Sequence, residues 1–340
     1  MYQYLLSICV PTYNRSSFLN ILLNSYLIEL DNDIHNQRIK ERVQLVIVDG
    51  NSSDNTESIV NEYKNKCILK YYKRENRVGI DKDILKCIEI ADGQYCWLFS
   101  DDDGFTNGAI SKLVSILSNE ETLTGCFCNR MPYDSDLTKK VVEINKWPEQ
   151  IFHENKYLRD KDLCFSKIGM DFGFISSQVV NKASWQKIVL TNNFEDLYNT
   201  YYLMVHIIAR MMDSEFTWLY INDPLVKQRT GNDSLLNSTG FLQRQIIEHN
   251  NFEKIITRHY NKRSKIYYIF FKKMVVRLPR VIANLKSQGV NIKTQIGILK
   301  LYISKYNNYR QLWIRVVPLF FIPNLVFIFV RKIYFKYLLN

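Results

Sequence analysis

The 340-residue sequence has no C-x-x-C pair among its seven cysteines, and Cys126 and Cys128 are too close together for the usual spacing of zinc ligands. It gives no indication of a zinc module or a disulfide framework, so we expect buried, reduced thiols, as in a cytosolic protein. Gly (12) and Pro (7) are few, and there is no low-complexity tract or obvious repeat, as in a globular protein. The amino-terminal segment lacks the basic start and long apolar core of a signal peptide.

Acidic residues are absent from the last quarter of the chain. Residues 254–340 contain 18 Lys and Arg and no Asp or Glu, which leaves 27 basic and 34 acidic side chains in residues 1–253, a formal net charge of −7. A mildly acidic body joined to a basic segment without acids predicts that this segment meets an anionic partner.

The apolar runs of that basic segment are too short for a membrane-spanning helix. The uncharged stretch 316–330 has 15 residues, two of them proline, whereas a spanning helix needs about 20 apolar residues. It is typical of an interfacial element, with Trp313 at the level of the lipid headgroups. We therefore expect residues 254–340 to bind an anionic membrane surface, which makes the protein cytoplasmic and peripheral on the inner face of the cytoplasmic membrane. Nucleic acid is not expected as a partner, because its binding needs no such apolar runs. A buried last helix at 316–330 remains an alternative.

In the first 115 residues, apolar runs alternate with stretches of helical periodicity. The runs predicted as strands are Leu5–Val10, Val43–Val48, Ile68–Tyr72 and Tyr95–Phe99. This alternation predicts an α/β fold with a Rossmann-like, mostly parallel and doubly wound sheet. From about residue 235 helical periodicity continues to the end, which predicts a basic helical extension at the carboxyl terminus.

Polar clusters follow three of these strands, at residues 11–15, 49–54 and 100–103. Ligands of such sheets bind at the carboxyl ends of the strands, so we expect the three clusters to meet in one crevice. Three consecutive carboxylates, Asp101–Asp103, are costly after a buried strand unless a cation accompanies them. Mg²⁺ or Mn²⁺ is the natural partner, since both prefer carboxylate oxygens and bridge to phosphates. The alternative is an acidic turn that caps the next helix.

The segments LSICVPTYNR, LVIVDGNSSDNT and NRVGIDKDILKCIEIADGQYCWLFSDDDG resemble the family 2 glycosyltransferases, which have the GT-A fold. The SDDD form, with GFISSQVV and PLVKQRTGNDS further on, is similar to the O-antigen abequosyltransferase-like enzymes of that family. The resemblance implies a GT-A nucleotide-sugar transferase domain over residues 1–234, with a donor half at 1–115 and an acceptor half at 116–234. A helical, membrane-associating region at 235–340 would follow.

The resemblance also implies a role for individual residues. The nucleotide pocket would be lined after the first strand, the base would hydrogen-bond to a carboxylate after the second, and an arginine in a late loop would bind the diphosphate. The donor-binding residues implied in this way are Pro11, Thr12, Tyr13, Arg15, Asp49, Asn51, Ser53, Arg77, Gly79, Asp81, Asp101, Asp102 and Arg229. The family's usual metal motif is Asp-x-Asp-Asp, and Ser100 replaces its first residue here. The divalent metal, Mn²⁺ or Mg²⁺, is therefore expected on Asp102 and Asp103.

The resemblance leaves two candidates for the catalytic base. Family 2 enzymes usually invert the anomeric centre in one displacement, which needs a base to take the proton of the acceptor hydroxyl. If Phe194 matches the family's Phe, the usual acidic pair falls on Leu203 and Met204, which cannot serve. His206 and Asp196 are the candidates, and His206 has the alternative of a hydrogen-bonded core histidine.

The resemblance thus implies a glycosyltransferase that moves a sugar from a nucleotide-sugar, a UDP- or CDP-sugar being favoured, to a glycan or lipid-linked sugar acceptor. The expected process is the synthesis of bacterial surface polysaccharide, such as O-antigen or capsule. Two alternatives remain. A sugar nucleotidyltransferase usually has a Gly-rich stretch near its first strand, and PTYNRSSFLN has no glycine. A non-catalytic nucleotide-sugar-binding protein would not need the intact triple aspartate.

Overall fold

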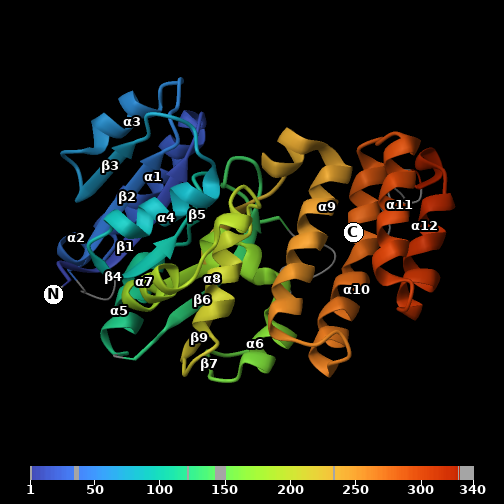
Figure 1. Cartoon of the computed structure of the whole chain (residues 1–340). Helices are drawn as coiled ribbons and strands as arrows, with labels where there is room; N and C mark the ends of the chain where they lie inside the picture. Colours follow the sequence, from blue (N-terminus) through green and yellow to red (C-terminus); the bar gives the residue numbers. More distant parts are fainter. Residues whose placement is uncertain are drawn as a thin grey trace. The chain divides into compact units, whose positions relative to one another are not determined.

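The computed structural model describes residues 2–33, 38–120, 122–141, 151–232, 234–327 and 329. The chain divides into two compact units, which Figure 1 shows in sequence colours. The first unit consists of Met1–Cys164 and Asp171–Gly231, and the second of Phe165–Met170 and Asn232–Asn340. The functional division of residues 1–234 into donor and acceptor halves stays a prediction.

The described part of the first unit contains a sheet of nine strands in the order β3-β2-β1-β4-β8-β6-β9-β5, with β7 paired to β9. The strands are β1 (Tyr4–Thr12), β2 (Val43–Asp49), β3 (Leu69–Lys73), β4 (Gly93–Leu98), β5 (Gly104–Phe105), β6 (Gly125–Tyr133), β7 (Lys156–Leu158), β8 (Gln178–Asn181) and β9 (Trp218–Arg229). The helices are α1 (Ser16–Asp31), α2 (Ile39–Arg42), α3 (Thr56–Tyr63), α4 (Ile80–Ile90), α5 (Ala109–Ser118), α6 (Lys161–Lys167), α7 (Lys182–Thr191) and α8 (Leu203–Met211).

The predicted α/β class is confirmed, and its parallel part is the amino-terminal half of the sheet. β1 pairs in parallel with β2 and β4, and β2 with β3. The carboxyl ends of these strands therefore lie at one edge, where Thr12 of β1 is directly opposite Asp49 of β2. In the second half β6 and β9 are parallel, whereas β8, β5 and β7 run antiparallel to their neighbours.

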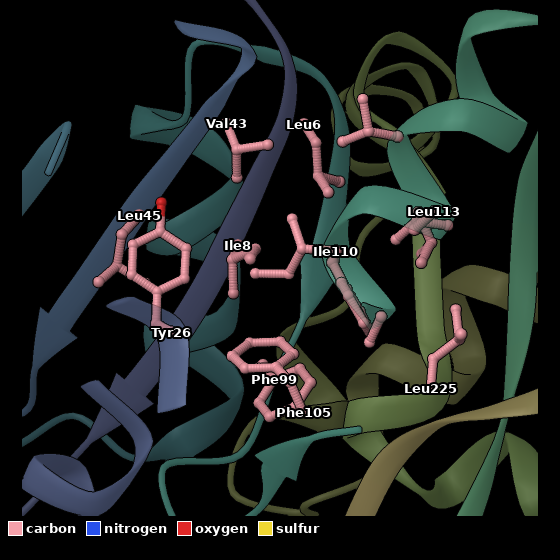
Figure 2. Close-up of a cluster of buried hydrophobic side chains, with 14 of the residues drawn as sticks. Leu6, Ile8, Tyr26, Val43, Leu45, Phe99, Phe105, Ile110, Leu113 and Leu225 are labelled. Atoms are coloured by element: carbon pink, nitrogen blue, oxygen red, sulfur yellow. The ribbon is translucent and has the colours of Figure 1, made fainter. Parts of the chain in front are cut away.

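Alternate residues of β1 lie on opposite faces of the sheet, as strand geometry requires. Leu6 and Ile8 belong to a fully buried cluster with Tyr26 of α1 and Ile110 of α5, which Figure 2 shows. On the other face α4 packs against β1 and β2. There the buried thiol of Cys9 lies beside Cys87 and Cys96, and its burial raises its pKa well above the usual value. All seven cysteines are free and six are buried, as predicted.

The described part of the second unit is helical. Its main helices are α9 (Ser234–His259), α10 (Lys265–Ser287), α11 (Ile292–Tyr306) and α12 (Val317–Phe321). Ser264 and Asn291 cap α10 and α11, each accepting a bond from a backbone N–H three residues on. Within the described part of the chain, none of the helices has the length and apolarity that crossing a bilayer requires. Residues 328 and 330–340 of the predicted membrane-binding segment lie outside the described residues.

A buried polar network holds α9 and α11 together. The ring of His249 on α9 bonds through Nδ1 to the hydroxyl of Tyr306, and its Nε2 lies 3.2 Å from Oε1 of Gln245. The hydroxyl of Tyr302 donates to the same Gln245 oxygen at 2.7 Å. Burial, with the nearby cations Lys305 and Arg244, lowers the pKa of His249 to about 3.

We expect acid to loosen the second unit before the first. The folded-state pKa of His249 is below its unfolded value of about 6.5, so its contribution to stability is present above that value and is lost as the pH falls towards 3. Between pH 7 and pH 4 the loss is about 3 kcal/mol. Hydrogen exchange of the amides of α9 and α11 at several pH values measures it. His249→Gln should show a flatter pH dependence, and an unchanged dependence would contradict the assignment.

Candidate active site

Three predicted polar segments meet at the carboxyl edge of the parallel strands. At the end of β1, the hydroxyl of Thr12 donates to Oδ2 of Asp101 at 2.8 Å. The backbone N–H of Gly50 donates to the carbonyl of Thr12 at 2.9 Å. Asn14 also binds segment 49–54, its N–H donating to Oγ of Ser52 at 2.8 Å. Segments 11–15, 49–54 and 100–103 are therefore brought together, as the strand order predicts.

The triple aspartate is buried, and each carboxylate has different partners. Asp101, Asp102 and Asp103 are 2%, 8% and 3% exposed. Asp101 binds Thr12 and Arg15, whereas Asp102 binds Arg15 and the hydroxyl of Ser100. Asp103 accepts from the hydroxyl of Ser176 at 2.6 Å and from the backbone N–H of Arg229 at 3.0 Å. Asp101 and Asp102 thus share Arg15, whereas Asp103 ties β9 to the end of β4.

The electrostatics of this cluster favour a cation. Burial, reinforced by the charge of Asp102, raises the pKa of Asp103 to about 7, although its hydrogen bonds oppose the shift. Burial also raises the pKa of Asp101 to about 7 against the effect of Arg15. A carboxyl group whose pKa is raised in this way gains from any further positive charge beside it. The cluster therefore holds more negative charge than its protein neighbours compensate.

Two arginines that are far apart in the sequence, Arg15 and Arg229, contact the cluster. Arg15 reaches Asp101 and Asp102 with two different nitrogens, each at 2.7 Å. Arg229, the last residue of β9, donates from Nε to the backbone carbonyl of Asp102 at 2.7 Å. Its Nη2 is buried and has no hydrogen-bond partner. Both guanidinium groups lie over the ring of Phe18, at 5.0 and 4.8 Å from its centroid.

Asp49 anchors the loop that follows β2. It is fully buried, and its carboxylate accepts from the N–H of Ser52 at 2.7 Å and from the hydroxyl of Tyr71 at 2.8 Å. The loop contains Asn51 with a positive φ of 75°, whose amide donates to the carbonyl of Glu75. Ser53 donates from its N–H to Asn14. These bonds give Asp49 a structural role in the loop. Its contact with a nucleobase stays a prediction.

The remaining predicted donor residues lie around the start of α4. The guanidinium of Arg77 stacks on the ring of Tyr13 at 4.1 Å, which joins the segment before α4 to the segment after β1. Pro11 is buried within β1. Asp81 is 2% exposed and accepts from the N–H groups of Tyr201 and Leu203, so it caps the start of α8. Burial raises the pKa of Asp81 to about 6.

The two candidate bases differ in exposure. His206 lies within α8 and is 2% exposed, among residues that are also buried. Asp196 is exposed on a short 3₁₀ turn, Glu195–Leu197. A hollow of about 450 Å³, lined by Leu85, residues 189–195 and Tyr198, adjoins this turn. The loop that follows contains two non-glycine residues with positive φ, Asn199 and Tyr201, and such backbone strain is common at functional sites.

This loop also packs against the predicted donor residues. Gly79 has a φ of 91°, and a Cβ added there would lie 2.6 Å from Oδ1 of Asn199. Glycine is thus required both by the backbone conformation and by the close approach of the loop.

Three further residues support the site, and two of them, Ser176 and Phe18, lie outside the predicted polar clusters. Ser176 bridges β4 and the cluster, because its Oγ accepts from the N–H of Ser100 at 3.0 Å and donates to Asp103. Phe18 supports the two arginines. Asp54 accepts from the N–H of Ser16 at 2.9 Å and so stabilises the first turn of α1. The segment GFISSQVV carried a signal for Ser176, because two consecutive serines interrupt an apolar run there.

The donor set fits a divalent cation shared with a phosphate. Among the described residues, no three His, Cys, Asp or Glu side chains are arranged to hold a metal ion by themselves. Mg²⁺ and Mn²⁺ in phosphate-transfer sites commonly use one or two carboxylates, with waters and substrate phosphates completing the shell. Asp102 suits this role best, because its side chain is 12% exposed whereas that of Asp101 is 3% exposed.

Comparison with known families decides the class of this site. Residues 7–177, which contain the parallel strands, the triple aspartate and Ser176, match the model of glycosyl transferase family 2. The chain belongs to this family. This glycosyltransferase is 29% identical over 269 residues to the abequosyltransferase RfbV of Salmonella typhimurium, with 76% of each chain covered. The predicted resemblance to that subgroup is confirmed.

Other relatives cover less of the glycosyltransferase or show its fold alone. It is 28% identical over 163 residues, 43% of its length, to the GalNAc(5)-diNAcBac-PP-undecaprenol β-1,3-glucosyltransferase of Campylobacter jejuni, half of which is covered. Residues 1–349 of TarS from Staphylococcus aureus, solved with UDP, have a similar fold, with a TM-score of 0.55 and 15% identity, and cover 96% of this chain and 91% of that one. These likenesses confirm the predicted GT-A fold.

Proposed function

We propose that this family 2 glycosyltransferase moves a sugar from a UDP- or CDP-sugar to a glycan or lipid-linked sugar acceptor, in the synthesis of bacterial surface polysaccharide such as O-antigen or capsule. The observation that carries the proposal is the buried cluster of Asp101–Asp103 with Arg15 and Arg229 at the carboxyl edge of the sheet. Carboxylates for a cation beside guanidinium groups for phosphates suit a nucleoside diphosphate. The Campylobacter jejuni relative, a glucosyltransferase named for an undecaprenol-linked glycan, supports the class of acceptor.

The donor would lie across the edge where segments 11–15, 49–54 and 77–81 meet. Tyr13 and Arg77 form a stacked pair that offers a planar surface to a base, and Asp49 would accept a hydrogen bond from a pyrimidine. The backbone of segment 49–53 is fixed by Asp49 and Asn14, so that the pocket is formed before the donor arrives. The other residues implied by the family resemblance would line the same pocket.

Asp102 would hold a divalent metal, Mn²⁺ or Mg²⁺, together with the donor diphosphate, and Asp103 would hold it as well or fix β9 through Arg229. When bound, the cation neutralises charge that develops on the departing diphosphate. A mannosyltransferase of Pyrobaculum calidifontis, solved with GDP-Man and Mn²⁺, has a similar fold, with a TM-score of 0.51. Arg229 would donate from Nη2 to the leaving phosphate, since that nitrogen is buried and has no other partner.

The base of the inverting displacement would be Asp196 or His206. An acceptor hydroxyl must come within hydrogen-bond distance of the base. Asp196 meets that condition in this conformation because it is exposed, and His206 would need α8 to move. Comparing Asp196→Asn with His206→Gln assigns the role, because only loss of the base removes transfer while donor binding persists.

The second unit would hold the enzyme at the inner face of the cytoplasmic membrane. Within the predicted last helix, 316–330, Val316 is fully buried, but α12 has no buried residue. Trp313, Ile314, Phe321 and Leu325 are 47%, 58%, 75% and 82% exposed. Exposed aromatic and aliphatic side chains in a segment with many Lys and Arg and no acids suit an anionic lipid surface.

We predict that the double substitution Phe321→Ser and Leu325→Ser weakens binding to vesicles of phosphatidylcholine and phosphatidylglycerol by about tenfold or more. The reason is that the variant lacks two apolar side chains that would transfer from water into the lipid surface. Leu190→Ser is the matched control, since Leu190 is 85% exposed but lies on α7 of the first unit. Vesicle sedimentation measures the effect. Equal binding by the double variant and the control would contradict this membrane surface.

Incubation of the purified enzyme with UDP-, CDP-, GDP- and dTDP-sugars tests the reaction itself. The proposal predicts slow, metal-dependent release of one nucleoside diphosphate without an acceptor, and EDTA should stop it. A nucleotidyltransferase would instead release pyrophosphate when it is given a sugar phosphate and a nucleoside triphosphate. A binding protein would release nothing.

A further inference from the structure

Arg15 spans two carboxylates. Its Nη1 pairs with Asp101 and its Nη2 with Asp102, both at 2.7 Å, so the guanidinium group bridges the two side chains. It therefore occupies a position that a metal ion on Asp102 would contest, because two cations cannot both approach Oδ2 of Asp102 closely. The Arg15 side chain is 20% exposed, more than either carboxylate, so it can leave towards solvent.

The surroundings of Arg229 indicate the partner towards which Arg15 would move. The guanidinium groups of Arg15 and Arg229 both lie over the Phe18 ring, at 5.0 and 4.8 Å from its centroid, so they are at most about 10 Å apart. An anion that binds between two like charges lowers their repulsion. Arg229 is 6% exposed, and its buried Nη2 has no hydrogen-bond partner, which is unusual for a charged donor. This unpartnered nitrogen indicates a place for an anionic oxygen.

We propose that Arg15 is an internal counter-ion that moves from the aspartates to the donor diphosphate when a divalent cation binds Asp102. This inference rests on the proposed function and goes beyond it by coupling the two ligands. In the metal-free protein Arg15 pairs with both Asp101 and Asp102, so two carboxylates share its single positive charge. A cation on Asp102 displaces the Nη2 of Arg15. The released guanidinium group stays in contact with Phe18, where Arg15 and Arg229 both donate to phosphate oxygens.

The exchange makes the binding of metal and of nucleotide mutually dependent. Without nucleotide, the metal must displace Arg15 into water, so its affinity is weakened. With nucleotide present, the displaced Arg15 gains a phosphate partner, so each ligand favours the other by the same factor. Arg15 is thus a positioning residue in the metal-free state and a diphosphate ligand in the loaded state.

Arg15→Gln tests the exchange through two affinities that should change in opposite directions. Without nucleotide, Mn²⁺ should bind about tenfold more tightly than to wild type, since no cation competes for Asp102. With saturating Mn²⁺, the nucleoside diphosphate that wild type binds should bind about tenfold more weakly. Electron paramagnetic resonance measures free Mn²⁺, and calorimetry measures the nucleotide. A merely structural role would not produce opposite changes.

The control for the metal measurement is Arg74→Gln. Arg74 forms another buried ion pair of the same unit, 2.9 Å from Asp83, and should leave the affinity for Mn²⁺ unchanged. If Arg15→Gln is poorly stable, its melting temperature gives a second measurement, because Mn²⁺ should raise it by more than it raises that of wild type.

The inference is overturned if Arg15→Gln binds Mn²⁺ as wild type does or more weakly, or if Mn²⁺ stabilises the two proteins equally. If wild type binds no nucleotide in the presence of Mn²⁺, the proposed function fails instead. The nucleotide-free Mn²⁺ measurement still decides whether Arg15 and the cation compete.

Discussion

Asp102→Asn is expected to lower kcat/KM of the glycosyltransferase by about a thousandfold, which corresponds to about 4 kcal/mol of transition-state stabilisation. The substitution keeps the shape of the side chain and the contact with Ser100, but it removes the charge that would bind a divalent metal. The loss should therefore appear as loss of metal dependence rather than as unfolding. Donor turnover as a function of Mn²⁺ concentration measures it.

Asp31→Asn is the matched control for Asp102→Asn. Asp31 pairs with Lys40 at the surface, and its side chain is 73% exposed, so this variant should keep the wild-type rate. A wild-type rate for Asp102→Asn, or a residual rate that still rises with Mn²⁺ as in wild type, would show that the metal is bound elsewhere.

Arg229→Gln should lower kcat by about a hundredfold to a thousandfold, with a smaller change in KM for the donor. The reason is that Nη2 would act on charge that grows as the diphosphate leaves, so its effect is greatest in the transition state. The backbone N–H of residue 229 still donates to Asp103 in the variant, so the end of β9 should remain in place. Steady-state kinetics with varied donor separates kcat from KM.

Lys227→Gln supplies the comparison for Arg229. Lys227 lies two residues earlier on β9 and stacks on Tyr133, so its loss should change kcat much less. Equal losses in both variants would mean that Arg229 contributes only general positive charge.

The amino-terminal half of the sheet could be predicted closely because its strands are mostly apolar runs, with single polar residues such as Ser7 in β1 and Gln44 in β2, that end at polar residues. The predicted strand 43–48 is β2 (Val43–Asp49), and the predicted strand 5–10 is β1 (Tyr4–Thr12). The crevice followed from this, since parallel strands place their carboxyl ends at one edge. In the second half, short strands such as β5 (Gly104–Phe105) gain their structure from pairing with β9, which no local pattern reveals.

Motifs predicted which residues belong to the site, but they did not predict which hydrogen bonds join those residues. Asp103 accepts from the backbone of Arg229, which is 126 residues away in the sequence, and Ser176 reaches the cluster from a 3₁₀ turn. Such contacts depend on the tertiary path of the chain. For the same reason the sequence could not distinguish a side chain that faces a ligand from one that supports the backbone. Asp81 shows this, because it caps α8.

Calorimetric titration with UDP, CDP, GDP and dTDP, each with Mn²⁺ and with EDTA, shows whether the triple aspartate binds a donor through a metal. We expect one pyrimidine nucleoside diphosphate to bind wild type in the presence of Mn²⁺, and EDTA or Asp102→Asn to remove most of that affinity. If no nucleotide binds in the presence of Mn²⁺, or if binding is the same with EDTA and in Asp102→Asn, then the triple aspartate and its arginines are not a metal-dependent donor site.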